Sequence, residues 1–437
     1  ETNLDWVGKE DDIVKKVELG NVSLPLNGSL ISGGQGLFGI KTELQFGRLR
    51  MTNIFTQDKG ESNSVEVKGG SQITEFNIQA HQYDANRHYF LSQFFKDQYD
   101  VALSNLPAVL STISIEKIEV WVTNRNGSIN QPRDIMSMMD LGENNPSNNA
   151  IISGGNGPQP QNSANDLYAQ LTGPGATRKS GEIIDDVNNL YGGAIKTGSD
   201  YDLVNYARML SENEYEINRQ LGYISLNTAL NNDEVLAVSY QYYYQGQLYR
   251  VGDFTQDVPL NSQEANVLFV KMLKPSLMRT NLPVWDLMMK NIYSLNTYNL
   301  NTDDLRFNVI YADDKSGAKL NYLPLEDPVF ANKRPLISAF NMDRVNRQQE
   351  AKPDGILDVL AGVTVDTRRG RIIFPVREPF GDYLKNNISS KENQDKYEFR
   401  ALYDSTKFWA EQDVFHNKFF LTGSYKGNSS SRISLGA

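Results

Sequence analysis

The stretch from Leu37 to Phe55 reads LFGIKTELQFGRLRMTNIF and carries the clearest structural signal in the chain. Before Gly47 the even positions hold apolar residues or threonine, and the odd positions between them hold glycine or polar residues. After Gly47 the apolar set becomes Leu49, Met51 and Phe55. A period of two predicts a half-buried strand, and a phase change beside glycine is typical of a β-bulge. The expected strand is much longer than usual, which suits a large barrel or its rim; a twisted sheet in a soluble domain is the alternative.

Similar patterns predict further strands and several helices. Strands are expected at Val17–Leu26, Thr74–Ile78, Ile113–Val122, Leu236–Tyr244, Gln247–Val251, Leu268–Leu273, Leu305–Tyr311 and Phe419–Tyr425, and Ile433–Leu435 resembles a strand cut off in mid-element. Helices are expected at Tyr89–Leu103, Ala164–Leu171, Glu182–Tyr191, Tyr201–Leu210 and Val284–Tyr293, the last started by Pro283. Hairpin turns are expected at Asn126-Gly127, at Gln245-Gly246 and at Arg368-Arg369-Gly370 within Val363–Val376. Residues 143–165 are rich in Asn, Pro, Gly, Ser and Gln, and we expect a mobile loop there. The fold class is therefore α+β and rich in β-structure.

The composition bounds the class of protein. The chain has 437 residues, more than the roughly 250–300 that one hydrophobic core serves, so two lobes or large insertions are expected. The net charge of -10 argues against a nucleic-acid partner and against docking on anionic lipid. The absence of cysteine excludes disulfides and thiolate zinc sites. No apolar run is long enough for a membrane-spanning helix, and the first residues do not resemble a signal peptide, so a signal was removed or the chain is part of a longer one.

A search for chemistry finds no catalytic, cofactor-binding or metal site. The three histidines, His81, His88 and His416, have no metal-ligand spacing, and no GxSxG motif is present, so we expect structural or surface roles for them. The acidic groups could bind calcium, but none of them matches a DxDxDG loop, so turn chemistry is the better interpretation. These groups are Asp185-Asp186, Asp303-Asp304, Asp313-Asp314, and Asp354 with Asp358.

Three other clusters have two interpretations each. The glycine clusters Gly33–Gly36 and Gly154–Gly157 do not follow phosphate-binding patterns and are expected to be turns. The cationic group at the predicted hairpin, with Arg368, Arg369 and Arg371, is expected to be a solvated tip and not an anion site. The tyrosine row from Tyr240 to Tyr244 could bind a sugar or peptide, but packing on a two-sided sheet is the favoured interpretation.

Longer phrases resemble one protein family in order along nearly the whole chain. They are Leu37–Gly47 with Arg48-Leu49, Asn86–Leu91, Asp233–Val238, Trp285–Asn291, Pro353–Ile356, Gly370–Val376 with Glu378–Gly381, and Leu402–Lys407. Each phrase alone is weak, but together they are specific. They resemble the SprA family, also called Sov, the outer-membrane translocon of the type IX secretion system.

The resemblance implies a segment of a very large outer-membrane β-barrel of Bacteroidota, which exports folded proteins and supports gliding motility. It implies a structural or gating role without enzymatic activity or cofactors. The implied partners are a PorV-like outer-membrane protein, a plug protein and secreted cargo proteins. We expect a barrel-associated β segment at residues 1–82, a soluble mixed α/β insertion with an extracytoplasmic location at 83–415, and returning strands at 416–437.

Two other functions stay open at this point. The first is an extracytoplasmic module that binds a carbohydrate or a cargo protein, through the tyrosine-rich strand. The second is a hydrolase whose acidic residues come together from distant loops, since the separation of paired carboxylates is a spatial property that sequence does not give.

Overall fold

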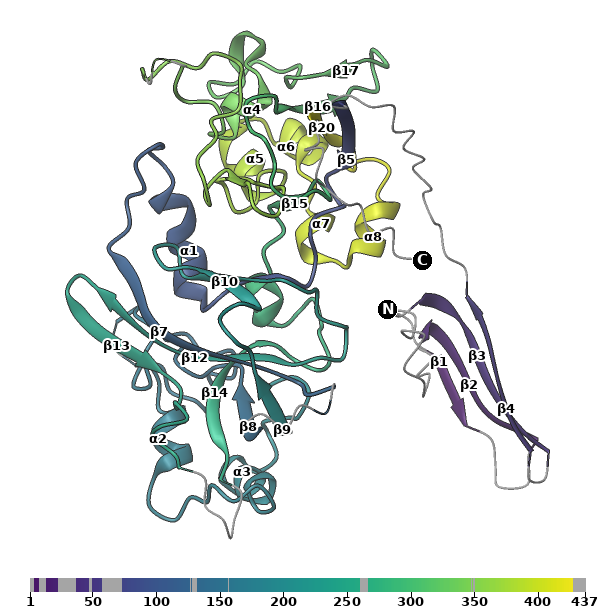
Figure 1. Ribbon diagram of the computed structural model, residues 1–437, viewed down its shortest axis with the longest axis vertical. Coiled ribbons are helices and arrows are strands. Elements are labelled where there is room, and N and C mark those ends of the chain that lie inside the picture. The colour runs from purple at the N-terminus through teal and green to yellow at the C-terminus, as the bar shows by residue number, and fades with distance from the viewer. Residues whose placement is uncertain are drawn as a thin grey trace. The chain divides into compact units, whose positions relative to one another are not determined.

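The computed structural model forms two compact units, Glu1–Lys68 and Gly69–Ala437 (Figure 1). It describes residues 4–7, 13–22, 37–46, 49–56, 73–125, 127, 132–155, 157–259, 266–346, 348 and 350–426. Among these residues no helix is long and apolar enough to cross a membrane. The predicted turn at Gly33–Gly36, the residue Asn126 and the strand expected at Ile433–Leu435 lie outside this set.

The first unit is one antiparallel sheet in the order β1-β2-β3-β4. Its strands are β1 (Leu4–Val7), β2 (Val14–Val22), β3 (Leu37–Phe46) and β4 (Leu49–Thr56). The expectation of one long bulged strand from Phe38 to Phe55 is wrong, because Phe46 pairs with Leu49 and the chain reverses between them. Directly paired residues share a face of the sheet, so Phe46 and Leu49 lie on the same face. Because they are three positions apart, an odd number, the apolar residues move from even to odd positions at the reversal.

The described residues of the second unit form four sheets, so the protein is a β-rich α+β protein with mostly antiparallel sheets. The largest has the order β13-β12-β14-β8-β9-β7, with strands β7 (Ile113–Val122), β8 (Arg133–Met138), β9 (Tyr201–Met209), β12 (Leu236–Tyr244), β13 (Gln247–Val251) and β14 (Leu268–Lys274). Because β12 also pairs with β7, the pairings β7-β12-β14-β8-β9-β7 run in a closed circuit. Each of these five strands contributes to a small separate core around Trp121, which places that core inside the circuit.

Three smaller sheets complete the second unit. They are β10-β11-β6, with β6 (His88–Phe90), β10 (Tyr215–Asn218) and β11 (Tyr223–Leu226); β15-β19-β18, with β15 (Ile292–Ser294), β18 (Val365–Asp366) and β19 (Arg371–Ile373); and β17-β16-β20-β5, with β5 (Ile73–Gln79), β16 (Arg306–Ala312), β17 (Lys319–Leu320) and β20 (Phe419–Lys426). Strands β5 and β20 pair directly although they flank the long segment between them. The segment predicted at residues 1–82 therefore includes the first unit and also β5 of the second.

The helices are short. They are α1 (Gln93–Ala102), α2 (Leu167–Thr172), α3 (Ile183–Tyr191), α4 (Leu336–Ala339), α5 (Asp382–Asn387), α6 (Lys391–Tyr397), α7 (Ala401–Asp404) and α8 (Lys407–Gln412), with 3-10 turns η1 (Pro283–Leu287) and η2 (Ala331–Lys333). Helices α4 to α8 gather with the β17-β16-β20-β5 sheet at one end of the unit (Figure 1). The apolar face of α1 covers the circuit, since Phe95 packs edge-to-face on Tyr240 and Tyr242.

Several local predictions are confirmed. The strands expected around Phe76, at Ile113–Val122, Leu236–Tyr244, Gln247–Val251, Leu268–Leu273, Leu305–Tyr311 and Phe419–Tyr425 are present as β5, β7, β12, β13, β14, β16 and β20, and the strand expected at Val17–Leu26 overlaps β2. The hairpin from β12 to β13 turns on Gln245 and Gly246, which both have positive φ angles of 49° and 81°. The hairpin at Val363–Val376 is also present, as β18 and β19.

Two local predictions are wrong. Tyr201–Leu210 is not a helix but contains β9, which lies between β7 and β8 and pairs with both. The helix expected at Val284–Tyr293 is only the short turn η1, after which β15 pairs with β19. In each case a strand pairing supplied by distant residues overrides local spacing.

Residues 143–155 and 157–165 form a series of turns that hydrogen bonds hold in place. The side-chain amide of Asn165 donates to the carbonyl oxygens of Asp140 and Glu143, at 2.7 and 2.8 Å. The carboxylate of Asp140 accepts from the N–H groups of Ser147 and Asn148. The loop prediction is therefore confirmed, and the expected mobility stays a prediction.

Candidate functional site

The sheet of the first unit separates apolar from polar side chains. The register places Leu19, Ile40 and Phe55 in one row across β2, β3 and β4. Paired residues share a face, and residues two positions apart along a strand share it too. The exposed large side chains of this apolar face are Trp6, Leu19, Ile40, Phe46, Leu49, Met51 and Phe55, and Leu44 on the same face is half-buried. Their exposed fractions run from 36% for Leu19 to 70% for Phe55.

The opposite face of the same sheet is polar. Its described side chains are Lys16, Lys41, Glu43, Gln45 and Thr52. Lys41 and Glu43 form an ion pair with an Nζ–Oε1 distance of 3.0 Å. The apolar face of this small unit is thus largely exposed, which is the reverse of a water-soluble sheet packed on its own core.

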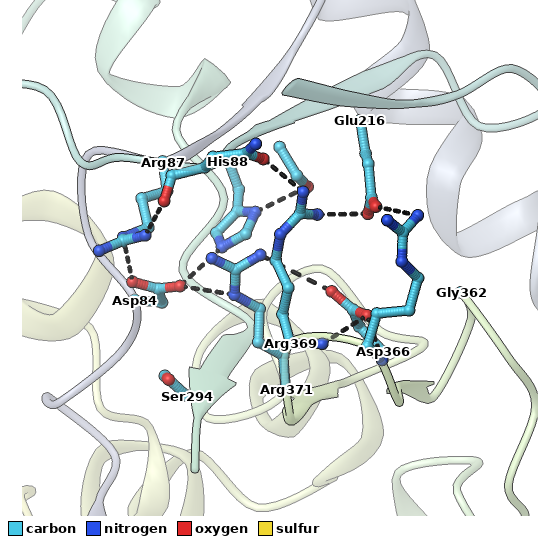
Figure 2. Close-up of polar contacts among 12 residues, drawn as sticks. Asp84, Arg87, His88, Glu216, Ser294, Gly362, Asp366, Arg369 and Arg371 are labelled. Carbon is cyan, nitrogen blue, oxygen red and sulfur yellow. Dashed lines mark hydrogen bonds and ion pairs between the residues drawn. The ribbon is translucent and has the colours of Figure 1, made fainter. Parts of the chain in front are cut away.

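A buried charge network forms the second candidate site (Figure 2). Asp84 and Arg87 precede β6, His88 begins it, and Arg371 begins β19. One carboxylate oxygen of Asp84, Oδ2, lies 3.1 Å from His88 Nε2 and 2.9 Å from Arg371 Nε. The other oxygen lies 3.0 Å from Arg87 Nε. Asp84 therefore holds the start of β6 against the β18–β19 hairpin.

Protonation in this network follows from burial and charge. Burial lowers the pKa of His88, and the hydrogen bond to Asp84 only partly opposes this. Burial also raises the pKa of Asp84, but the hydrogen bond from His88 and the charges of Arg371 and Arg87 outweigh it, so this pKa lies below its ordinary value. The imidazole is therefore neutral, with its proton on Nε2 because the carboxylate only accepts.

His88 bridges Asp84 to Ser225, an arrangement that the sequence did not reveal. The hydroxyl of Ser225 lies 2.8 Å from His88 Nδ1 and donates to it, although the two residues are 137 positions apart. These three residue types also occur in hydrolase triads. Here the Arg371 guanidinium is paired with the same oxygen of Asp84 that His88 uses, so this carboxylate is already neutralised and would stabilise an imidazolium poorly. The geometry favours a structural bridge.

A cavity of about 310 Å³ lies beside this network. Its walls are the sheet β10-β11-β6 and the segment from residue 361 to β19. Ile217, Ile292 and Ile373 form apolar wall, and Glu216, Asp366, Arg368 and Arg371 supply charged groups.

The arginine cluster at the hairpin is not the solvated tip that the sequence predicts. Only the Arg368 side chain is well exposed, at 78%, and Arg371 is buried. Arg368 and Arg369 both pair with Glu216 of β10. The prediction is wrong because a distant strand and the turn before β6 bring carboxylates to the hairpin.

The tyrosine row offers no exposed platform across its length. Tyr240 and Tyr242 are fully buried, and Tyr242 donates from its hydroxyl to the carbonyl oxygen of Pro160 at 3.0 Å. Tyr243, which lies between Tyr242 and Tyr244 and therefore on the other face of β12, is exposed. The packing interpretation of this row is therefore the correct one.

Other candidate residues of the second unit make hydrogen bonds outside the Asp84 network. His81 contacts the side-chain amide of Asn417, and His416 contacts the carboxylate of Asp413. Asp313 accepts from the N–H and hydroxyl of Ser316, as turn chemistry predicts. Within the described part of the chain, no group of three or more metal-binding side chains comes together.

The comparison with known families identifies the chain. The sequence model described as "Motility related/secretion protein", SprA_N, matches residues 2–230, more than half of the chain. The protein therefore belongs to the SprA N-terminal family of motility-related and secretion proteins, as the sequence phrases predicted. No curated protein matches the chain.

Proposed function

We propose that this protein is a segment of a type IX secretion translocon and forms a structural and gating part of its protein-conducting pore. The first unit would contribute strands to an outer-membrane β-barrel, and the second would be an extracytoplasmic portion. Membership of a motility and secretion family supports this proposal at the level of the system. The observation that supports the barrel role most directly is the exposed apolar face of the first unit.

The apolar face suits hydrocarbon better than water. In a membrane barrel, apolar side chains alternate outward and polar ones inward, and strands of about 9–11 residues span the bilayer core. Strands β2, β3 and β4 have 9, 10 and 8 residues. The polar face with Lys41 and Glu43 would then line the interior, where charged groups are accepted.

A conduit needs surfaces and not a reaction centre, so we propose no enzymatic activity and no cofactor. The proposed partners are a PorV-like outer-membrane protein, a plug protein and the exported cargo. The alternative of a carbohydrate-binding strand has lost its main support, because Tyr240 and Tyr242 are buried.

The membrane-facing role can be tested with neighbouring residues on opposite faces. The segment has no cysteine, so Met51→Cys and Thr52→Cys can each carry a nitroxide label in outer membranes, in full-length protein whose cysteines outside the segment have been replaced. Relaxation by lipid-soluble oxygen should dominate at Met51, and relaxation by a water-soluble nickel chelate should dominate at Thr52. Chelate-dominated relaxation at Met51 would refute the assignment.

The gating role can be tested by deletion of residues 83–415 from the full-length protein. Gln79 and Phe420 are direct partners in the β5–β20 pair, so a short linker can join the two ends. We expect the barrel to assemble and cargo export to be lost or uncontrolled. Normal, regulated export by an assembled deletion variant would show that the second unit does not gate.

A further inference from the structure

The charged side chains of the network do not balance. Its ion pairs join four arginines (Arg87, Arg368, Arg369, Arg371) to three carboxylates (Asp84, Glu216, Asp366). His88 adds no charge, because burial lowers its pKa. The four charged residues that line the cavity itself are balanced, and the Arg368 side chain is 78% exposed. The need for an anionic partner therefore arises at the buried Arg371.

Arg371 shows where that partner is needed. The side chain is 5% exposed and lines the cavity, and its Nε pairs with Asp84 at 2.9 Å. Its buried Nη1 makes no hydrogen bond within the described part of the chain. The nearest carboxylate oxygen, Asp366 Oδ2, lies 3.7 Å away, beyond hydrogen-bond distance. A buried guanidinium N–H without an acceptor costs free energy that a bound oxygen would recover.

The walls of the cavity indicate the rest of the ligand. Ser225 donates its proton to His88 and keeps its lone pairs, and the exposed guanidinium of Arg368 stands at the cavity beside Glu216. Ile217, Ile292 and Ile373 supply apolar wall. A volume of about 310 Å³ admits a small molecule and not a folded domain.

We propose that this cavity binds a small ligand with one oxyanion group, a carboxylate or phosphate, held between Arg371 and Arg368, and an apolar body that lies against the three isoleucines. The site is independent of the apolar face in the first unit, and it does not require the pore function.

The test is calorimetric titration of the 437-residue chain with butyrate and with butyl phosphate, with butyramide as the neutral control. We expect saturable binding of at least one anion and none of butyramide. Preference between the two anions identifies the head group as carboxylate or phosphate. Equal binding of butyramide, or no saturable binding of either anion, would overturn the proposal.

Variants locate the site without disturbing the buried pair. Arg368→Gln removes an exposed charge and should weaken anion binding at least ~10-fold, the size of a lost charged hydrogen bond. Ala361→Phe should fill the cavity and abolish binding while the urea midpoint stays unchanged, since Ala361 is exposed at the cavity wall. Arg125→Gln, at a surface pair with Asp233 away from the cavity lining, is the matched control and should bind normally. Wild-type affinity in both cavity variants would place binding elsewhere and refute the site.

Discussion

Replacement of Asp84 by asparagine should destabilise the second unit far more than loss of a surface carboxylate. Asp84→Asn keeps the side-chain volume but removes the negative charge that faces Arg87, His88 and Arg371. The Asp84 side chain is 12% exposed and that of Arg371 is 5% exposed. The variant therefore leaves a buried guanidinium without its closest counter-ion.

The magnitude follows from the distances. Each N–O contact near 3 Å is worth about 5 kcal/mol of gross attraction at an effective dielectric constant of ~20, and desolvation offsets much of it. Removal of one partner of a buried pair costs about 3–5 kcal/mol, because the remaining charge stays buried. We expect a loss of about 3 kcal/mol or more in the free energy of unfolding, since Asp366 still lies 3.7 Å from Arg371.

Urea unfolding of the full chain at neutral pH, followed by near-ultraviolet circular dichroism, measures this loss. Asp314→Asn is the matched control, because Asp314 is 66% exposed in its pair with Lys418 and should cost only ~0.2–1 kcal/mol. Addition of Arg371→Met to Asp84→Asn should recover much of the loss, since it removes the stranded charge. Similar losses for Asp84→Asn and Asp314→Asn would refute the reasoning.

Three other perturbations test the fold. Gly423→Ala should lower the thermal midpoint by the equivalent of about 3 kcal/mol. The reason is that a Cβ at this position would lie 1.9 Å from the carbonyl oxygen of Arg306 in the neighbouring strand. An unchanged midpoint would contradict the β16–β20 register. Burial lowers the pKa of His88 from 6.5, so below about pH 6.5 the unfolded chain binds a proton that the folded chain excludes. The free energy of unfolding should therefore decrease as the pH falls below this value, by at most ~1.4 kcal/mol per pH unit. Urea midpoints across this range should show a flatter profile for His88→Gln, and an identical profile would rule out His88 as the source. Phe95→Ala should cost about 3–5 kcal/mol in urea unfolding, whereas Val101→Ala on the exposed side of α1 should cost under ~0.5 kcal/mol; equal costs would mean that α1 does not pack as described.

Sequence alone determined the elements whose pattern is local. Alternation along β3 and β12 fixes which side chains share a face, because the period of two is a property of the strand backbone. The turn at Gln245-Gly246 is equally local, since it joins adjacent strands of one hairpin. The family resemblance was also readable in the sequence, and the SprA N-terminal match over residues 2–230 confirms the family.

Tertiary structure decided everything that depends on a distant partner. Tyr201–Met209 becomes a strand because β7 and β8 offer hydrogen bonds on both sides, and no local spacing encodes those neighbours. Arg371 appears as part of a hairpin tip in sequence and becomes a buried cation only because Asp84 lies next to it. The apolar alternation of Leu37–Phe55 was visible from the start, but its division into two paired strands with one exposed apolar face required the register, since the same pattern fits a bulge or a reversal.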